Sequence, residues 1–454
     1  MAGDTVLAET DQIYRRLRWQ IFIVTWLAYA GFYLTRKSFS VAKIGIQDDP
    51  SLRMIDAQMA WIDGAYLVAY AIGQFIFGIA GDRMGPRRVV AAGMFVSILS
   101  AVAMGASTWV VMFGVFFLIQ GLAQSSGWAP LSKNMSMFFS RPERGMVMGL
   151  WCTNYAMGGL IASIIAGWAG DRWGWRYAFY VPAGGLLLVW LLFLLLQRNR
   201  PEDVGLPPIE QYHGEPPDVP AVGASAVIEQ DGSWKVVGEV LTNRMVLLLS
   251  AVYFLLKPTR YAILFWGPKY INSKLGSGMT ESGALSAMFE LAGPAAALGG
   301  GILSDKLFGT RRVPVCVICL LLLGALLVSF NSFPVTRLSL GLSFFAIGLL
   351  LFAPDTLVAG AASVDFGTKR GASTASGVIN GMGSIGAILG GTLPGFFNQR
   401  WGWGGVFTFL GIMSFVAGLI LLPKWNALPK TAKPREGSEV SPAPKTAAAE
   451  EGSS

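Results

Sequence analysis

The stretch GIAGDRMGPRR, residues 78–88, decides the fold because a second version of it occurs later in the chain. That version is GILSDKLFGTRR, residues 301–312, and the aspartates of the two stretches lie 223 positions apart. Each stretch follows an apolar segment and ends on a pair of arginines, which is typical of a charged turn at the end of a membrane-spanning helix. The recurrence indicates a chain built from two similar halves.

Two further landmarks support this duplication. ERG at 143–145 corresponds to KRG at 369–371, an offset of 226 residues. RWGWRYAF at 172–179 corresponds to RWGWGGVF at 400–407, an offset of 228 residues. Three separate landmarks at nearly one offset argue against coincidence, and they predict a parallel repeat with six spans in each half.

The composition places both halves in a membrane. Of the 454 residues, 53% are hydrophobic and only 14% are charged, and the mean hydropathy is +0.52. A soluble protein of this size exposes far more charge, so the ordinary soluble classes are excluded. The three cysteines, Cys152, Cys316 and Cys319, lie in apolar stretches, and we expect them to be packing residues without a metal or cofactor.

The apolar stretches predict an all-α membrane protein with twelve transmembrane helices in two pseudo-symmetric six-helix halves, residues 20–196 and 245–423. Residues 1–19 are a cytoplasmic N-terminal segment, residues 197–244 a polar cytoplasmic linker, and residues 424–454 a disordered cytoplasmic tail. The expected spans are 20–44, 59–80, 88–107, 109–131, 146–168, 177–196, 245–271, 283–303, 313–332, 337–361, 372–397 and 403–423.

Lysine and arginine set the expected orientation. Most of the 35 lie in the two tails and in the loops on the same side as the tails, which predicts that both termini are cytoplasmic. We expect an integral protein of a bacterial cytoplasmic membrane that works as a monomer in the lipid bilayer. The net charge of +8 then reflects topology, and no nucleic-acid partner is expected.

Five cations are nevertheless expected within the membrane: Arg36, Lys37, Lys133, Lys257 and Arg260. A charge at the centre of a membrane helix costs about 2.5–3.5 kcal/mol on insertion scales, so each needs an explanation. An offset of 224 residues places Arg36 on Arg260. The two arginines should therefore lie at similar depth on opposite sides of the axis between the halves.

The same offset places Tyr29 on Tyr253 and Tyr33 on Lys257. In each half these positions and the arginine are spaced i, i+4, i+7, so they share one helical face. Arginine offers a planar fork of donors that binds phosphate or carboxylate bidentately, and it keeps its proton when buried. The tyrosines add hydroxyl donors to the same face.

The predicted spans hold three carboxylates, Asp63, Glu290 and Asp355, against five cations. The shortfall of two negative charges favours a dianionic ligand, such as inorganic phosphate or a phosphate monoester. A single buried arginine can instead pair with an acid for purely structural reasons, but the matching register of two arginines favours ligand binding. For Lys257 both explanations stay open. Lys37 is expected to be structural.

Five motifs carry a resemblance to a known family, the organophosphate:phosphate antiporters of the major facilitator superfamily. The resemblance covers about residues 12–423. The motifs are YRRLRWQIF (14–22), YLTRKSF (33–39), GWAP (127–130), RPEDVGLPPIEQY (200–212) and RYAILFWGPKYI (260–271).

The resemblance implies a binding site. In that family the arginines of spans one and seven bind the phosphoryl group, and they correspond to Arg36 and Arg260. The tyrosines of span one correspond to Tyr29 and Tyr33, and a glutamate of span eight to Glu290 in FELAG. The implied activity is exchange of a phosphorylated metabolite for inorganic phosphate by alternating access.

Three positions depart from the glycerol-3-phosphate transporters within that family. Gln74 stands where they have lysine, Tyr155 where they have histidine, and Lys257 where they have tyrosine. The organic end of the substrate is therefore expected to differ, with a sugar phosphate at least as plausible as glycerol-3-phosphate. Lys257 is a candidate replacement for the cation missing at Gln74.

Four charged residues at the cytoplasmic ends of spans two and eight are predicted to be gating latches: Asp82, Arg83, Asp305 and Lys306. Lys133 is expected to line or gate the path. No nucleophile–base cluster is present, so an enzyme is not expected. Two other functions stay open, a membrane sensor of sugar phosphates that signals to a histidine kinase and a proton-coupled facilitator, although the latter predicts an acid-centred site.

Overall fold

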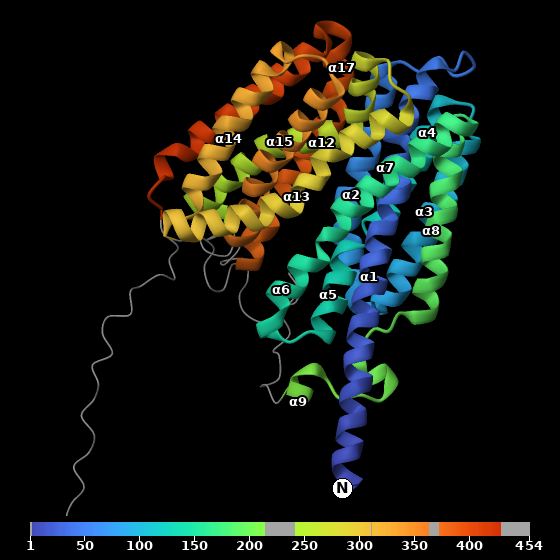
Figure 1. The fold of residues 1–454 in the computed structure, drawn as a ribbon, viewed down its shortest axis with the longest axis vertical. Helices are drawn as coiled ribbons and strands as arrows, with labels where there is room; N and C mark the ends of the chain where they lie inside the picture. The colour runs from blue at the N-terminus through green and yellow to red at the C-terminus, as the bar shows by residue number, and fades with distance from the viewer. Residues whose placement is uncertain (1, 214–240, 310, 363–371, 428–454) are drawn as a thin grey trace, which may run out of the picture.

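The computed structural model describes residues 2–213, 241–309, 311–362 and 372–427. Within those ranges it contains helices and no β-strand, which confirms the all-α class. Figure 1 shows two helical bundles, one made by the first half of the chain (blue to green) and one by the second half (yellow to red). The predicted tail and most of the predicted linker lie outside the described residues.

The first half crosses the bundle six times, and two of its crossings are broken helices. The breaks fall at residues 125–127 and at Cys152. A short helix, α9 (Ile209–His213), follows the last crossing and packs with Tyr14 near the start of the chain. The helices of this half are α1 (Ala2–Asp48), α2 (Asp56–Met84), α3 (Pro86–Ala106), α4 (Val110–Gln124), α5 (Trp128–Phe138), α6 (Arg141–Trp151), α7 (Thr153–Trp173) and α8 (Tyr177–Leu196).

The second half repeats this arrangement. Its last two crossings are one continuous element that bends at Gly402, whose φ of 66° is a left-handed conformation that glycine adopts readily. A π-helical turn, Leu357–Ala362, extends the fourth helix of this half. The helices are α12 (Arg244–Leu275), α13 (Met279–Phe308), α14 (Arg312–Ser329), α15 (Arg337–Thr356) and α17 (Ala372–Leu421).

Among the described residues, ten helices are long and apolar enough to cross a membrane. The first crossing, α1, is not one of them because Arg36, Lys37 and Lys43 lower its hydropathy. Adding α1 and dividing α17 at Gly402 makes the structure consistent with the twelve predicted spans.

The two halves are joined at the end of the molecule that lies away from the N-terminus, here called the far side. Hydrophobic packing crosses the join, since one buried cluster contains Phe39 and Tyr66 of the first half with Phe265 of the second. Asp171 at the end of α7 accepts hydrogen bonds from the backbone N–H groups of Met279 and Thr280, both at 2.8 Å. Asp171 therefore caps α13 from the opposite half.

A kink in α12 provides the second contact between the halves. Pro268 has no N–H, so the carbonyl of Leu264 lacks its usual helical donor. Side chains of α1 fill this role: Ser40 donates to the Leu264 carbonyl at 2.9 Å and Lys37 at 3.2 Å. Lys43 donates to the next carbonyl, that of Phe265, at 3.0 Å. This use of Pro268 was not predicted from the sequence.

A buried ion pair is the third contact on the far side. Asp56 at the start of α2 pairs with Lys269 of α12, and it also accepts a hydrogen bond from Asn398 of α17 at 2.7 Å. Lys269 is only 3% exposed. The ion pair therefore ties the first half to two helices of the second.

Helices α2 and α17 show where the join ends. A Cβ added at Gly395 would lie 2.7 Å from the Cβ of Ala60, and one added at Gly391 would lie 2.6 Å from a methyl of Leu67. Beyond Leu67, toward the N-terminal side, the two helices line a cavity instead of packing together. The structure is thus closed on the far side and hollow on the side of the N-terminus.

The Asp56–Lys269 pair gives a stability prediction. Lys269→Met leaves a buried carboxylate without its cation, so the free energy of unfolding should fall by about 3–5 kcal/mol. Thermal and denaturant unfolding of the purified protein in detergent measures this change. Adding Asp56→Asn should recover a large part of the loss, and a Lys269→Met variant as stable as wild type would contradict a structural role for the pair.

Candidate binding site

Arg36 lies in the middle of α1 and is only 4% exposed. Its Nε donates a hydrogen bond to Oε1 of Gln124 at 3.0 Å. Its guanidinium carbon lies 4.5 Å from the ring centre of Tyr33 and 5.0 Å from that of Tyr70. Aromatic faces at these distances attract a cation without neutralising its charge.

Gln124, the last residue of α4, is the anchor that holds Arg36. Its Oε1 also accepts from the hydroxyl of Tyr66 at 2.8 Å. Its Nε2 donates to the Phe32 carbonyl at 3.1 Å and to the Thr35 hydroxyl at 2.9 Å. Because both ends of the amide are occupied, Gln124 has one orientation and fixes the Nε edge of Arg36.

The outer edge of Arg36 remains available. Among the described residues, no carboxylate lies within ion-pair distance of Arg36, and its buried Nη2 has no hydrogen-bond partner. A buried charged donor without a partner costs free energy, which is expected at a site that awaits an anionic ligand.

Arg260 on α12 is held differently. Its Nη1 donates to Oδ2 of Asp355 at 2.7 Å, and Lys257 forms an ion pair with Oδ1 of the same carboxylate at 2.8 Å. The guanidinium carbon of Arg260 lies 4.9 Å from the ring centre of Phe352 and 5.7 Å from that of Tyr155. Two cations thus share one carboxylate.

Both arginines line one small pocket between the halves, called the first cavity. Three other residues predicted for the site line it too: Tyr33, Tyr155 and Glu290. The remaining lining residues are Tyr261, Leu264, Phe289 and Phe352.

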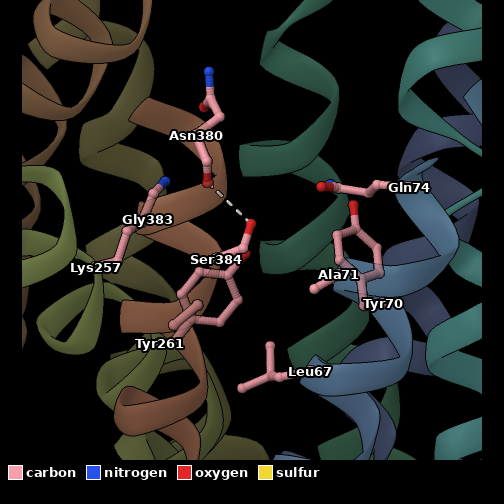
Figure 2. Close-up of a pocket in the computed structure, with 10 residues that line it drawn as sticks. Leu67, Tyr70, Ala71, Gln74, Lys257, Tyr261, Asn380, Gly383 and Ser384 are labelled. Atoms are coloured by element: carbon pink, nitrogen blue, oxygen red, sulfur yellow. Dashed lines mark hydrogen bonds between the residues drawn. The ribbon is translucent and has the colours of Figure 1, made fainter. Parts of the chain in front are cut away.

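A larger neighbouring cavity is lined by two more predicted residues, Gln74 and Lys257. Figure 2 shows Tyr70 and Gln74 of α2 on one side, with Lys257 and Tyr261 of α12 and Ser384 of α17 on the other. Tyr261 lines both cavities. Amide, hydroxyl and ammonium groups therefore surround a space next to the two arginines.

Two predicted hydroxyl donors lie elsewhere. Tyr29 is buried with its ring centre 5.4 Å from that of Trp128 and 5.6 Å from that of Trp151. Tyr253 lies 4.5 Å under the ammonium of Lys257. Neither tyrosine lines the two cavities. Each lies seven residues, or about two helical turns, before its arginine, where neighbouring side chains cover it.

Glu290 is placed in the first cavity but is not free. It lies 3.4 Å from the ammonium of Lys37, which crosses from α1 to α13 in the opposite half. Lys37 is thereby neutralised, and together with its bond to the α12 kink this supports the structural role expected for it.

The count of five cations and three carboxylates from the sequence was incomplete. Lys43 is fully buried against Asp63, and Lys269 against Asp56. Lysines near the ends of spans usually reach the membrane surface, but α1 and α12 extend past the predicted ends and enclose these two. The cations enclosed in the described core are Arg36, Lys37, Lys43, Lys257, Arg260 and Lys269, and the carboxylates are Asp56, Asp63, Glu290 and Asp355.

The structure therefore has the same excess of two positive charges as the count from the sequence, although the residues counted differ. Lys37, Lys43 and Lys269 each have a carboxylate of their own. The excess remains on Arg36, which has none, and on Arg260 with Lys257, which share Asp355. All three line the two cavities, so the positive charge in excess is concentrated there. In the part of the chain described, no group of three His, Cys, Asp or Glu residues is placed to hold a metal ion.

Of the four predicted latch residues, the structure describes the side chains of two. Arg83 at the end of α2 and Lys306 at the end of α13 are exposed. The side chains of Asp82 and Asp305 lie outside the described residues. Their proposed pairing is therefore not tested.

Sequence reasoning missed Gln124, Tyr70 and Tyr261 in this site. Tyr66, Tyr70 and Gln74 recur every four residues along α2, which is a detectable polar stripe on one helical face. No local signal marks Gln124, because its partners are contributed by α1 and α2.

Comparison with known proteins agrees with the fold and shows the family. Residues 21–380 match the family described as Major Facilitator Superfamily. The chain is 31% identical to the Probable hexose phosphate transport protein of Chlamydia pneumoniae over 92% of this chain and 94% of that one. It is likewise 31% identical to the Membrane sensor protein UhpC of Escherichia coli, over 92% and 94%. The crystal structure of a bacterial homologue of the human lysosomal transporter Spinster, inward-facing and unoccupied, has a TM-score of 0.71 at 15% identity, covering 90% and 96%.

Gln124 can be tested against a matched glutamine one helical turn away. Gln124→Met removes the hydrogen bond that orients Arg36, and a hydrogen bond to a charged group contributes about 1.5–3 kcal/mol. Affinity for inorganic phosphate, measured by calorimetry, should fall at least about tenfold. Gln120→Met removes an equally buried amide that has no partner among the described residues, so it should leave affinity unchanged. Equal effects of the two variants would contradict the assigned role.

Proposed function

Because this chain belongs to the organophosphate:phosphate antiporters of the Major Facilitator Superfamily, we propose that it exchanges a phosphorylated metabolite for inorganic phosphate across the membrane. The observation that carries the proposal is the pair of arginines on one cavity, one of them buried without a carboxylate partner. A phosphate dianion supplies the two negative charges that the described core lacks.

The uncompensated charge gives a physical basis for exchange. When phosphate lies between Arg36 and Arg260, the halves close around a neutral site. Without it, closure buries two positive charges in excess of the carboxylates, and desolvation of each uncompensated charge costs several kcal/mol. The carrier therefore crosses the membrane loaded and seldom empty, so one anion leaves as another enters.

The organic part of the substrate occupies the neighbouring cavity. Gln74, Ser384 and Tyr261 present amide and hydroxyl groups, which form hydrogen bonds with the hydroxyls of a sugar. Lys257 shares this cavity with Gln74, which supports the hypothesis that it replaces the cation missing there. A sugar phosphate is therefore the substrate class we favour.

Alternating access follows from rocking of the halves. The closed side carries the Asp56–Lys269 pair, and the hollow side is the side of the N-terminus. We assign that side to the cytoplasm of a bacterial inner membrane, where Arg83 and Lys306, with the neighbouring aspartates, latch the opposite state. A monomer contains every element of this mechanism.

A membrane sensor is the second candidate, because one relative at 31% identity bears that name. A sensor binds the same ligand without transporting it. Binding and flux must therefore be measured on the same preparation.

The first experiment is exchange of labelled phosphate in proteoliposomes preloaded with phosphate. Wild type should exchange, and Arg36→Lys and Arg260→Lys should each lose at least about tenfold in rate, because a lysine offers no bidentate fork. Arg337→Lys is the matched control, since Arg337 is 77% exposed and remote from the cavities.

A second arm omits phosphate from the liposome interior. Uptake should then fall close to background, because the empty carrier does not return. Equal uptake with and without internal phosphate contradicts obligate exchange. Binding of a sugar phosphate without any flux favours the sensor. If the protein shows no binding and no flux, the assignment of phosphate as its ligand is wrong.

A further inference from the structure

Asp355 occupies a special position that the predicted site did not include. Its carboxylate is 6% exposed and lies between two cations on successive turns of α12. Oδ2 accepts from Arg260 at 2.7 Å, and Oδ1 forms the ion pair with Lys257 at 2.8 Å. Among the described residues, these two cations are the ion-pair partners of Asp355.

Asp355 holds these cations from behind the cavities. It lines neither of them, whereas Arg260 lines the arginine cavity and Lys257 lines the neighbouring one. Its helix is locally irregular, because Pro354 precedes it and the π-helical turn begins two residues later. Irregular turns of this kind often occur at functional sites, where a side chain must change position.

The two arginines are consequently unequal before a ligand arrives. Arg36 is oriented by a neutral amide and keeps its full charge, whereas part of the fork of Arg260 is occupied by a carboxylate. An anion that binds to both must compete with Asp355 for Arg260. A carboxylate and a phosphate dianion on one guanidinium repel each other strongly at low dielectric.

We propose that Asp355 is a positioning residue that changes partners when the substrate binds. In the empty carrier it bridges Arg260 and Lys257, and when phosphate binds between Arg36 and Arg260 it remains with Lys257 alone. This inference rests on the proposed function, since it takes phosphate as the ligand. No proton or covalent bond changes hands.

The exchange of partners has two consequences. Asp355 weakens phosphate binding by occupying Arg260, and it speeds release by returning to Arg260 as the phosphate departs. Lys257 strengthens binding by retaining Asp355. The effect of Lys257 on phosphate affinity therefore depends on the presence of Asp355. If the two residues acted only through their separate charges, their effects on affinity would add.

A double-mutant cycle tests this dependence through the dissociation constant of inorganic phosphate, measured by calorimetry on the purified protein. Asp355→Asn should bind about tenfold more tightly and exchange more slowly, whereas Lys257→Met should bind about tenfold more weakly. The double variant should bind as tightly as Asp355→Asn, because Lys257 then has no carboxylate to retain. Glu281→Gln, which removes a remote acid from the same half, should leave the constant unchanged.

Several outcomes overturn the inference. One is a folded Asp355→Asn protein that binds phosphate no more tightly than wild type. Another is a cycle in which the effects of Asp355→Asn and Lys257→Met on the dissociation constant simply add. Folding is checked by thermal unfolding. If Asp355→Asn alone does not fold, the double variant is compared with Lys257→Met. The inference is overturned if the double variant binds phosphate no more tightly than Lys257→Met. Wild type that binds no phosphate overturns the proposed function itself.

Discussion

The charge of Arg36 is the constraint on which the rest of the site depends. A guanidinium keeps its proton even when buried, so the free-energy cost of burying it is offset only by hydrogen bonds, aromatic faces and a counter-ion. The protein supplies the first two through Gln124 and Tyr33, and under the proposed function the substrate supplies the third. The binding energy of an anion is thereby coupled to the closing of the cavity around it.

The contacts between the halves obey the same rule that polar groups in a membrane must be satisfied. Pro268 frees a carbonyl in α12, and α1 provides Ser40 and Lys37 to satisfy it. Asp171 similarly satisfies backbone N–H groups at the start of α13. Each contact joins a polar side chain of one half to backbone groups of the other, so it can form and break as the halves move.

The charged residues fall into two groups with different tasks. Lys43 and Lys269 have carboxylates of their own and lie away from the cavities, so they contribute to the join between the halves. Lys257 and Arg260 share Asp355 and line the cavities, so their charge is only partly compensated. A cation with a carboxylate of its own therefore has a structural role, whereas the cations that share one carboxylate line the cavities.

The sequence by itself determined the duplicated all-α architecture and the two arginines, because a repeat offset relates residues at equal depth without any knowledge of packing. It did not reveal Gln124, the sharing of Asp355, or the burial of Lys43 and Lys269. Those features depend on contacts between residues 20 to 222 positions apart, and on how far α1 and α12 extend beyond the apolar stretches. Hydropathy records the position of a charge along a helix, whereas only the tertiary structure decides which side chain faces it.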